Sequence, residues 1–243
     1  FSRTYYPPGN ATLAIAGDVD SAHARALVER YFAEIPAGPP VPPVEAPAVS
    51  LARDVYRVLE DDVQLPRLYM TWHSPAAYEP GDAEMEAIGE VLADGKASRL
   101  HRSLVYEKQV AQSVSAFQDA GRLGSAFYIV VTARPGVELG PLEDEVRSTI
   151  AALATQGVRA EEVERARNHI ETAFVDELQN VGGFGGRADR LNSYWFFVRD
   201  AGYFDRDLER YRTLTAEGIR EAARRILTKP CVTLSVVPRG RSD

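Results

Sequence analysis

The sequence contains four histidines and one cysteine, side chains that often bind a catalytic metal or act as a nucleophile. A zinc site on one helix needs a spacing such as H-E-x-x-H or H-x-x-E-H, which places two ligands and a base on one face. No histidine begins either motif. We interpret all four as solvated or hydrogen-bonded side chains, and predict no catalytic residue, no metal site and no bound cofactor in this chain. They are His23, His73, His101 and His169.

His169 shows why the helical spacing gives no support for a metal. The positions one turn away on its predicted helix are Arg165, Ala166, Thr172 and Ala173, so we infer that no second ligand lies beside it. One alternative is an independent enzyme with a site built from His169, Glu164 or Asp189, although no spacing supports it.

Two further segments could carry chemistry. Cys231 lies in an apolar run with no histidine near it in sequence, which indicates a buried and unreactive thiol. Residues 183–188 match G-x-G-x-x-A, but a dinucleotide site needs a strand before the glycines, and here a long helix is predicted before them. We interpret the glycines as a connection between two helices and as a candidate hinge. They are Gly182, Gly183, Gly185 and Gly186.

Length and composition limit the remaining classes of function. With 243 residues, of which 45% are hydrophobic, the chain can form one large core, or one domain and part of another. The net charge of −7 repels phosphate backbones and argues against nucleic-acid binding. No apolar run has membrane-spanning length, so no transmembrane segment is predicted. The location stays open between the periplasm or cell envelope and the cytoplasm.

A proline-rich stretch divides the chain. Residues 10–19 are predicted to form a strand and residues 21–35 a helix. Residues 36–50 form the predicted linker, because prolines fix the backbone and remove hydrogen-bond donors. We therefore predict a strand–helix part at 1–35, a linker at 36–50 and a larger domain at 51–243. The linker prolines are Pro36, Pro39, Pro40, Pro42, Pro43 and Pro47.

Beyond the linker the predicted strands arrive in pairs. This order favours an α+β fold, in which helices cover a mainly antiparallel sheet. Thr215 is a predicted N-cap, with Leu214 and Ile219 spaced to form a hydrophobic staple. The predicted strands are 55–59, 65–73, 111–118, 125–133 and 231–237. The predicted helices are 82–92, 98–108, 142–153, 160–178, 187–198 and 203–212.

Several segments in a fixed order resemble one family, the pitrilysin-type zinc peptidases, or inverzincins. This family includes insulin-degrading enzyme and the mitochondrial processing peptidases. Residues 1–36 resemble the end of its catalytic domain, and the linker falls where the family joins two homologous domains. The other segments resemble the second, non-catalytic domain of bacterial members, and they are residues 92–116, 161–179, 182–197 and 203–215.

The resemblance also implies where chemistry takes place. The family's zinc motif, H-x-x-E-H with a distant glutamate, belongs to the first domain, upstream of Phe1. A second feature is an arginine and a tyrosine, seven positions apart, which hold the substrate carbonyl. Alignment on residues 113–116 puts Val105 at the arginine position and Gln112 at the tyrosine position. Valine donates no hydrogen bond, so this pair is degenerate, although both positions remain candidates for the substrate chamber.

The resemblance therefore implies a non-catalytic domain of a zinc-dependent endopeptidase. Such a domain forms a chamber wall for peptides or unfolded chains and supports a zinc domain in the same polypeptide or in a partner subunit. Zinc is expected in that missing domain, and this chain alone is predicted to be inactive. The alternative is an interaction or scaffold module, such as an inactive subunit of a heterodimeric peptidase or a core-subunit-like protein.

Overall fold

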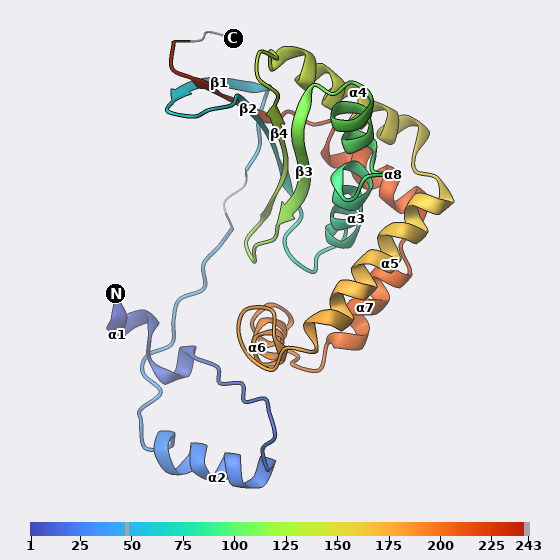
Figure 1. Cartoon of the computed structure of the whole chain (residues 1–243). Helices are drawn as coiled ribbons and strands as arrows, with labels where there is room; N and C mark the ends of the chain where they lie inside the picture. The colour runs from blue at the N-terminus through green and yellow to red at the C-terminus, as the bar shows by residue number, and fades with distance from the viewer. Residues whose placement is uncertain (47–48, 241–243) are drawn as a thin grey trace. The chain divides into compact units, whose positions relative to one another are not determined.

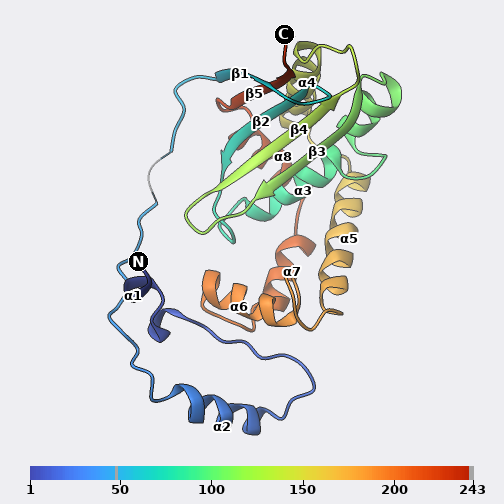
Figure 2. The same cartoon turned by 60° about the vertical axis from the view of Figure 1, so that its left-hand side comes forward.

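The structure is a computed structural model that describes residues 1–46 and 49–240 (Figures 1 and 2). Backbone contacts divide the chain into two units. The first combines Phe1–Glu45 with Glu171–Leu208, and the second combines Ala46–Ile170 with Glu209–Asp243. The units do not follow chain order, and the boundaries expected at 35/36 and 50/51 stay a prediction. Pro47 of the expected linker lies outside the described residues.

The second unit contains a five-stranded sheet with the order β1-β5-β2-β4-β3. Neighbouring strands pair antiparallel except for β1 and β5, which are parallel. The sequence prediction of an α+β fold with a mainly antiparallel sheet is thereby confirmed. The strands are β1 (Val55–Asp61), β2 (Arg67–Ser74), β3 (Ala111–Asp119), β4 (Ser125–Ala133) and β5 (Val232–Pro238).

Helices cover one face of this sheet. Figure 1 shows α3 (Asp82–Ala93), α4 (Gly140–Gln156) and α8 (Ala216–Ile226) on the same side of the strands. Alternation along β2 explains the arrangement, because Leu68, Met70 and Trp72 are buried while the residues between them are not. Their partners on β4 also alternate, and Phe127 and Ile129 are fully buried. The core therefore lies between the sheet and these helices.

The start of α8 matches the predicted cap. The Thr215 hydroxyl accepts a hydrogen bond from the backbone N–H of Gly218 at 3.0 Å. Leu214 and Ile219, on either side of the cap, are both buried. The predicted N-cap is confirmed, and both residues of the predicted staple are in the core.

The helix predicted at 98–108 forms with an unexpected geometry. Residues 101–107 make a π-helix, η2 (His101–Glu107), in which the Lys108 N–H donates to the Ser103 carbonyl at 2.9 Å. Such wide turns are rare and often mark functional positions. Leu104 is fully buried and anchors this turn to the core.

The first unit contains mainly helices. They include α1 (Ser2–Tyr5), α2 (Ser21–Phe32) and α6 (Arg187–Val198), and a 3₁₀ turn, η1, spans Pro8–Asn10. Two helices, α5 (Ala160–Glu177) and α7 (Phe204–Arg212), contribute residues to both units. The strand predicted at 10–19 is wrong, because residues 11–16 have no regular structure and pair with no strand among the described residues. Alternating apolar residues alone do not make a strand, which needs a neighbour for its backbone hydrogen bonds.

Packing in the first unit centres on Tyr194. This side chain is buried, and its hydroxyl donates a hydrogen bond to the Asp207 carboxylate at 3.0 Å. The ring centroids of Phe174 and Phe204 lie 5.8 Å apart, and the Arg190 guanidinium lies over Phe174 at 4.6 Å. These contacts join α5, α6 and α7 within the unit. Among the described helices, none has both the length and the hydropathy needed to cross a membrane.

Candidate functional site

The structure separates the two positions that the sequence resemblance paired. Val105 lies in η2 and is half-buried, whereas Gln112 lies near the start of β3 and is exposed. Gln112 is the extra residue of a β-bulge, since Ala111 pairs with Ala133 and Ser113 pairs with Thr132. Bulges redirect side chains and recur near binding sites. Of the two positions, only Gln112 lines the polar cavity described next.

The cavity at Gln112 has a volume of about 370 Å³ and lies on the second unit. Its polar groups include Arg67 and Tyr69 from β2, and the Arg67 guanidinium donates to the Tyr69 hydroxyl at 3.2 Å. A guanidinium, a phenol and an amide therefore surround one space. These groups can donate hydrogen bonds to carbonyl or carboxylate oxygens. The lining residues are Val63, Gln64, Leu65, Arg67, Tyr69, Gln112, Ser113, Thr132 and Val236.

The sheet face that α3, α4 and α8 do not cover is rich in apolar and aromatic side chains. The strand register places on it Tyr69, Tyr128 and Leu234, all half-buried, together with Phe117, which is 47% exposed. The rings of Phe117 and Tyr128 stack with centroids 5.4 Å apart. We call this surface the open face. An extended chain with apolar side chains can pack against such a surface.

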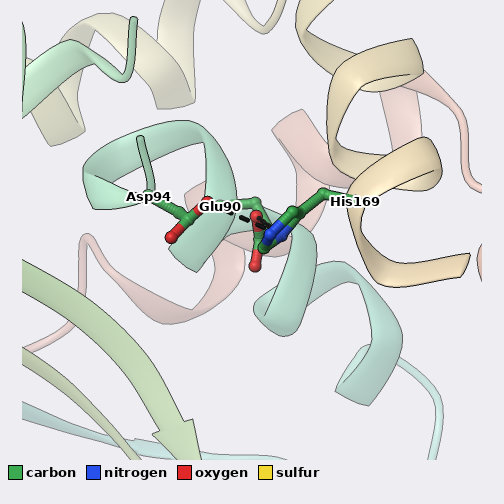
Figure 3. A group of neighbouring side chains, drawn as sticks. All are labelled: Glu90, Asp94 and His169. Atoms are coloured by element: carbon green, nitrogen blue, oxygen red, sulfur yellow. Dashed lines mark ion pairs between the residues drawn. The ribbon is translucent and has the colours of Figure 1, made fainter. Parts of the chain in front are cut away.

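A second cluster lies on the helical side of the same unit, where His169 of α5 faces the end of α3 (Figure 3). The His169 Nδ1 is 2.7 Å from Glu90 Oε2 and 3.5 Å from Asp94 Oδ2. The inference that His169 has no second ligand beside it is therefore wrong. Both carboxylates come from the end of α3, so the spacing of residues along α5 could not reveal them.

Electrostatics distinguish Glu90 from an ordinary surface glutamate. Burial raises the pKa of its carboxyl to about 7, the nearby Asp94 charge also raises it, and His169 opposes the shift. The Glu90 side chain is 21% exposed. A carboxylate that is partly desolvated beside a second carboxylate is stabilised by a nearby cation. The cluster is therefore suited to holding positive charge.

The other histidines have no comparable surroundings. His23 is exposed at the start of α2, and its backbone N–H donates to the Asp20 cap at 2.7 Å. His73 is exposed near the end of β2, and His101 is half-buried in η2. None of these three belongs to a group of three metal-ligating side chains within the described residues.

Cys231 is buried, as the sequence predicted. Burial raises the pKa of its thiol, although Arg147, whose Nη2 lies 3.6 Å from the sulfur, opposes the shift. A raised pKa lowers the thiolate fraction, and the thiolate is the reactive form. Cys231 therefore has the surroundings of a structural thiol.

The glycine-rich segment connects α5 and α6, as predicted. Gly183 and Gly185 have φ values of +82° and +78°, which L-residues with a Cβ adopt only with strain. The Gly185 N–H donates to the Asp189 carboxylate at 2.9 Å, so Asp189 stabilises this turn. Gly182 and Gly186 lie close together, since a Cβ on Gly186 would meet the Gly182 oxygen at 2.6 Å. Their role as a hinge stays a prediction.

Of the three candidates for an independent active site, only His169 lies in a group of metal-ligating side chains within the described residues. Glu164 is exposed and does not join the cluster of His169, Glu90 and Asp94. Asp189 accepts its hydrogen bond within the glycine-rich turn. The two features that the structure does assemble are the open face with its polar cavity and the His169 cluster.

Comparison with known proteins identifies the family. A family model described as the peptidase M16 inactive domain matches residues 1–170. The chain belongs to this family, which confirms the resemblance to zinc peptidases of the inverzincin type and to their inactive domain.

Similar individual proteins come from bacteria. The zinc protease PqqE of Helicobacter pylori is 23% identical over 190 residues, which are 76% of this chain and 43% of that protein. The crystal structure of a protease from Helicobacter pylori has a TM-score of 0.78 at 17% identity, covering 92% of this chain and 54% of that one. A peptidase M16 inactive domain from Pseudomonas fluorescens has a TM-score of 0.76 at 19% identity, covering 93% of this chain and 53% of that one. The chain thus spans about half the length of these relatives.

Proposed function

We propose that this chain is the non-catalytic part of a zinc-dependent endopeptidase, and that its open face forms one wall of a chamber for peptides or unfolded chains. The observation that carries this proposal is the match to an inactive peptidase domain. The zinc belongs to a catalytic domain outside this chain, in the same polypeptide or in a partner subunit. The chain supports that domain and does not itself cleave peptides.

The composition of the open face supports a role in peptide binding. Half-buried aromatic and aliphatic side chains, among them Tyr69, Tyr128 and Leu234, can pack against the side chains of an extended peptide. At one end of the face, Arg67 and Gln112 offer donors to peptide oxygens within the polar cavity. The first group offers a packing surface and the second offers hydrogen-bond donors. The surface therefore has features that bind a peptide.

The degenerate pair fits the same role. With Val105 half-buried in η2 and Gln112 on the bulge, the chain has one amide donor in place of the guanidinium and phenol that the family resemblance describes. Arg67 and Tyr69 supply these two groups from β2, although at different positions in the sequence. We propose that they position substrate and do not stabilise a reacting oxyanion.

A peptide titration followed by NMR tests this role. On addition of an unfolded casein-derived peptide, resonances of Tyr69, Tyr128 and Leu234 should shift. Resonances of Trp72 and Phe127, on the helix-covered side of the sheet, should stay in place.

A matched pair of variants completes the test. Leu234→Ser should weaken the peptide-induced shifts, whereas Glu164→Gln on an exposed part of α5 should leave them unchanged. Absence of any saturable shift on the open face would reject the chamber-wall role. That result would favour the alternative, a scaffold module that binds a partner subunit and no substrate.

A further inference from the structure

The cluster of Glu90, Asp94 and His169 brings together three metal-ligating groups from two helices, as Figure 3 shows. Glu90 and Asp94 are one turn apart at the end of α3, and His169 comes from α5. One ligand atom from each residue lies within 4.8 Å of the others. All three residues belong to the second unit.

Charge at this end of α3 favours a cation. The C-terminal end of a helix carries partial negative charge from its unpaired carbonyls, and acidic residues there are unfavourable. Glu90 lies in the last turn of α3 and Asp94 is its C-cap, while no basic residue lies in that turn. Two carboxylates and the helix end therefore place negative charge at one point. His169 is the group that faces them.

The space around the cluster can hold an ion with solvent ligands. A cavity of about 170 Å³ is lined by all three side chains. Ligand atoms in a tetrahedral zinc site, at about 2.1 Å from the metal, are about 3.4 Å apart. His169 Nδ1 is 2.7 Å from Glu90 Oε2 and 3.5 Å from Asp94 Oδ2, and these two distances bracket this value. Side-chain rotations on the ångström scale would thus bring the three groups to coordinating distance.

We propose that Glu90, Asp94 and His169 form a binding site for a divalent cation of the zinc type, which links the end of α3 to α5. One imidazole and two carboxylates suit Zn²⁺ or Co²⁺, and water completes the coordination. The site is separate in role from the catalytic zinc of the peptidase, and it does not depend on the function proposed above. It differs from the sequence prediction that the chain binds no metal, and the experiment below decides between the two.

Three other charged residues line the same cavity, and the two basic ones oppose the cation. Lys96 follows α3, and Arg165 lies one turn before His169 on α5. The third, Glu162, is bound to Arg99 and contributes its charge to that pair. Arg165→Gln should therefore increase metal affinity, because it removes a repelling charge without removing a ligand.

Titration of the EDTA-treated chain with Co²⁺ tests the site, because tetrahedral Co²⁺ has visible absorption bands that octahedral Co²⁺ in water lacks. We expect saturation at one Co²⁺ per chain and displacement by Zn²⁺. His169→Ala and Glu90→Gln should each weaken binding by roughly tenfold or more. Zn²⁺ should raise the unfolding temperature of the unaltered chain and leave that of His169→Ala in place.

Matched variants show whether the effect is specific to the cluster. His23→Ala removes an exposed histidine from the first unit, and Glu164→Gln removes an exposed carboxylate from α5. Both should bind Co²⁺ as the unaltered chain does. The proposal fails if no saturable uptake occurs, or if His169→Ala and Glu90→Gln bind Co²⁺ as tightly as these controls.

Discussion

The ion pair between Arg99 and Glu162 allows a quantitative prediction. Glu162, in the first turn of α5, is 1% exposed and accepts two hydrogen bonds from the Arg99 guanidinium at 2.9 and 2.8 Å. It also accepts the Arg159 backbone N–H at 2.8 Å. The same guanidinium donates to the Gly157 carbonyl at 2.8 Å, so the pair joins the segment before η2 to the turn before α5. We expect Glu162→Gln to destabilise the second unit.

The expected size follows from the pKa of Glu162. Burial by itself would raise this pKa, but hydrogen bonds and the charge of Arg99 lower it from 4.5 to about 2. A shift of one unit corresponds to about 1.4 kcal/mol, so the ionised form contributes roughly 3 kcal/mol. Glutamine keeps one acceptor and Arg99 is 21% exposed, so part of this energy is retained. We expect Glu162→Gln to lower the free energy of unfolding by about 2–3 kcal/mol at pH 7.

The effect must also depend on pH with a defined sign. Because the folded-state pKa is below the unfolded value of 4.5, the contribution is fully present above pH 4.5. It is lost as the pH falls through 4.5 toward about 2, where the folded state also takes up the proton. The difference between the unaltered chain and Glu162→Gln should therefore be constant at neutral pH and shrink in acid. Other carboxylates titrate in both proteins and cancel in this difference.

Urea unfolding followed by tryptophan fluorescence measures the difference. Trp72 is buried in the second unit and reports on it, and Trp195→Phe removes the other tryptophan, which is 43% exposed. Measurements at pH 7, 4 and 3 cover the predicted window. Glu164→Gln, an exposed neighbour on α5, should change stability by less than about 0.5 kcal/mol. If Glu162→Gln lowers the free energy of unfolding by less than about 0.5 kcal/mol at pH 7, the ion pair does not stabilise the unit as expected. A loss that stays constant down to pH 3 would show that it does not come from the ionised Glu162.

Two further substitutions test local structure. Thr215→Ala removes the N-cap of α8 and should lower the free energy of unfolding in urea by about 1 kcal/mol. Thr215→Ser keeps a hydroxyl and should recover most of this loss. Equal stability of all three proteins would contradict the role of Thr215 as a cap. Gly183→Ala puts a Cβ at φ +82° and should destabilise the first unit by about 1 kcal/mol. Hydrogen exchange of the α6 amides measures this loss. Gly182→Ala should have a smaller effect, because φ there is not left-handed and a Cβ meets nothing within 4 Å. A larger loss for Gly182→Ala than for Gly183→Ala would contradict the predicted strain.

The sequence predicts the sheet of the second unit well, because alternation and partners occur together there. Met70 and Ile129 are paired neighbours that point to the same core, and each strand has a partner that satisfies its backbone. Residues 10–19 have similar alternation, but within the described residues they pair with no strand. The period of the pattern shows what a segment can bury, and pairing decides whether it becomes a strand.

The sites were harder to predict, for two physical reasons. The cavity at Gln112 depends on a bulge, which shifts the register by one residue and leaves no trace in local hydrophobicity. The cluster at His169 joins helices that are distant in the chain, so spacing along α5 alone could not reveal it. One signal was present in the sequence. Glu90 and Asp94 lie four residues apart at the end of a predicted helix, where acidic residues are unfavourable unless a cation is near.

Under the function proposed above, this chain assists peptide cleavage without performing it. The most direct measurement is the initial rate of cleavage of a fluorogenic peptide by the zinc-bearing peptidase domain, as this chain is titrated into the reaction. We expect no cleavage by the chain alone and a rate that rises to saturation at one chain per zinc-bearing domain. A rate that does not respond to the chain, or cleavage by the chain alone, would rule out the proposed function.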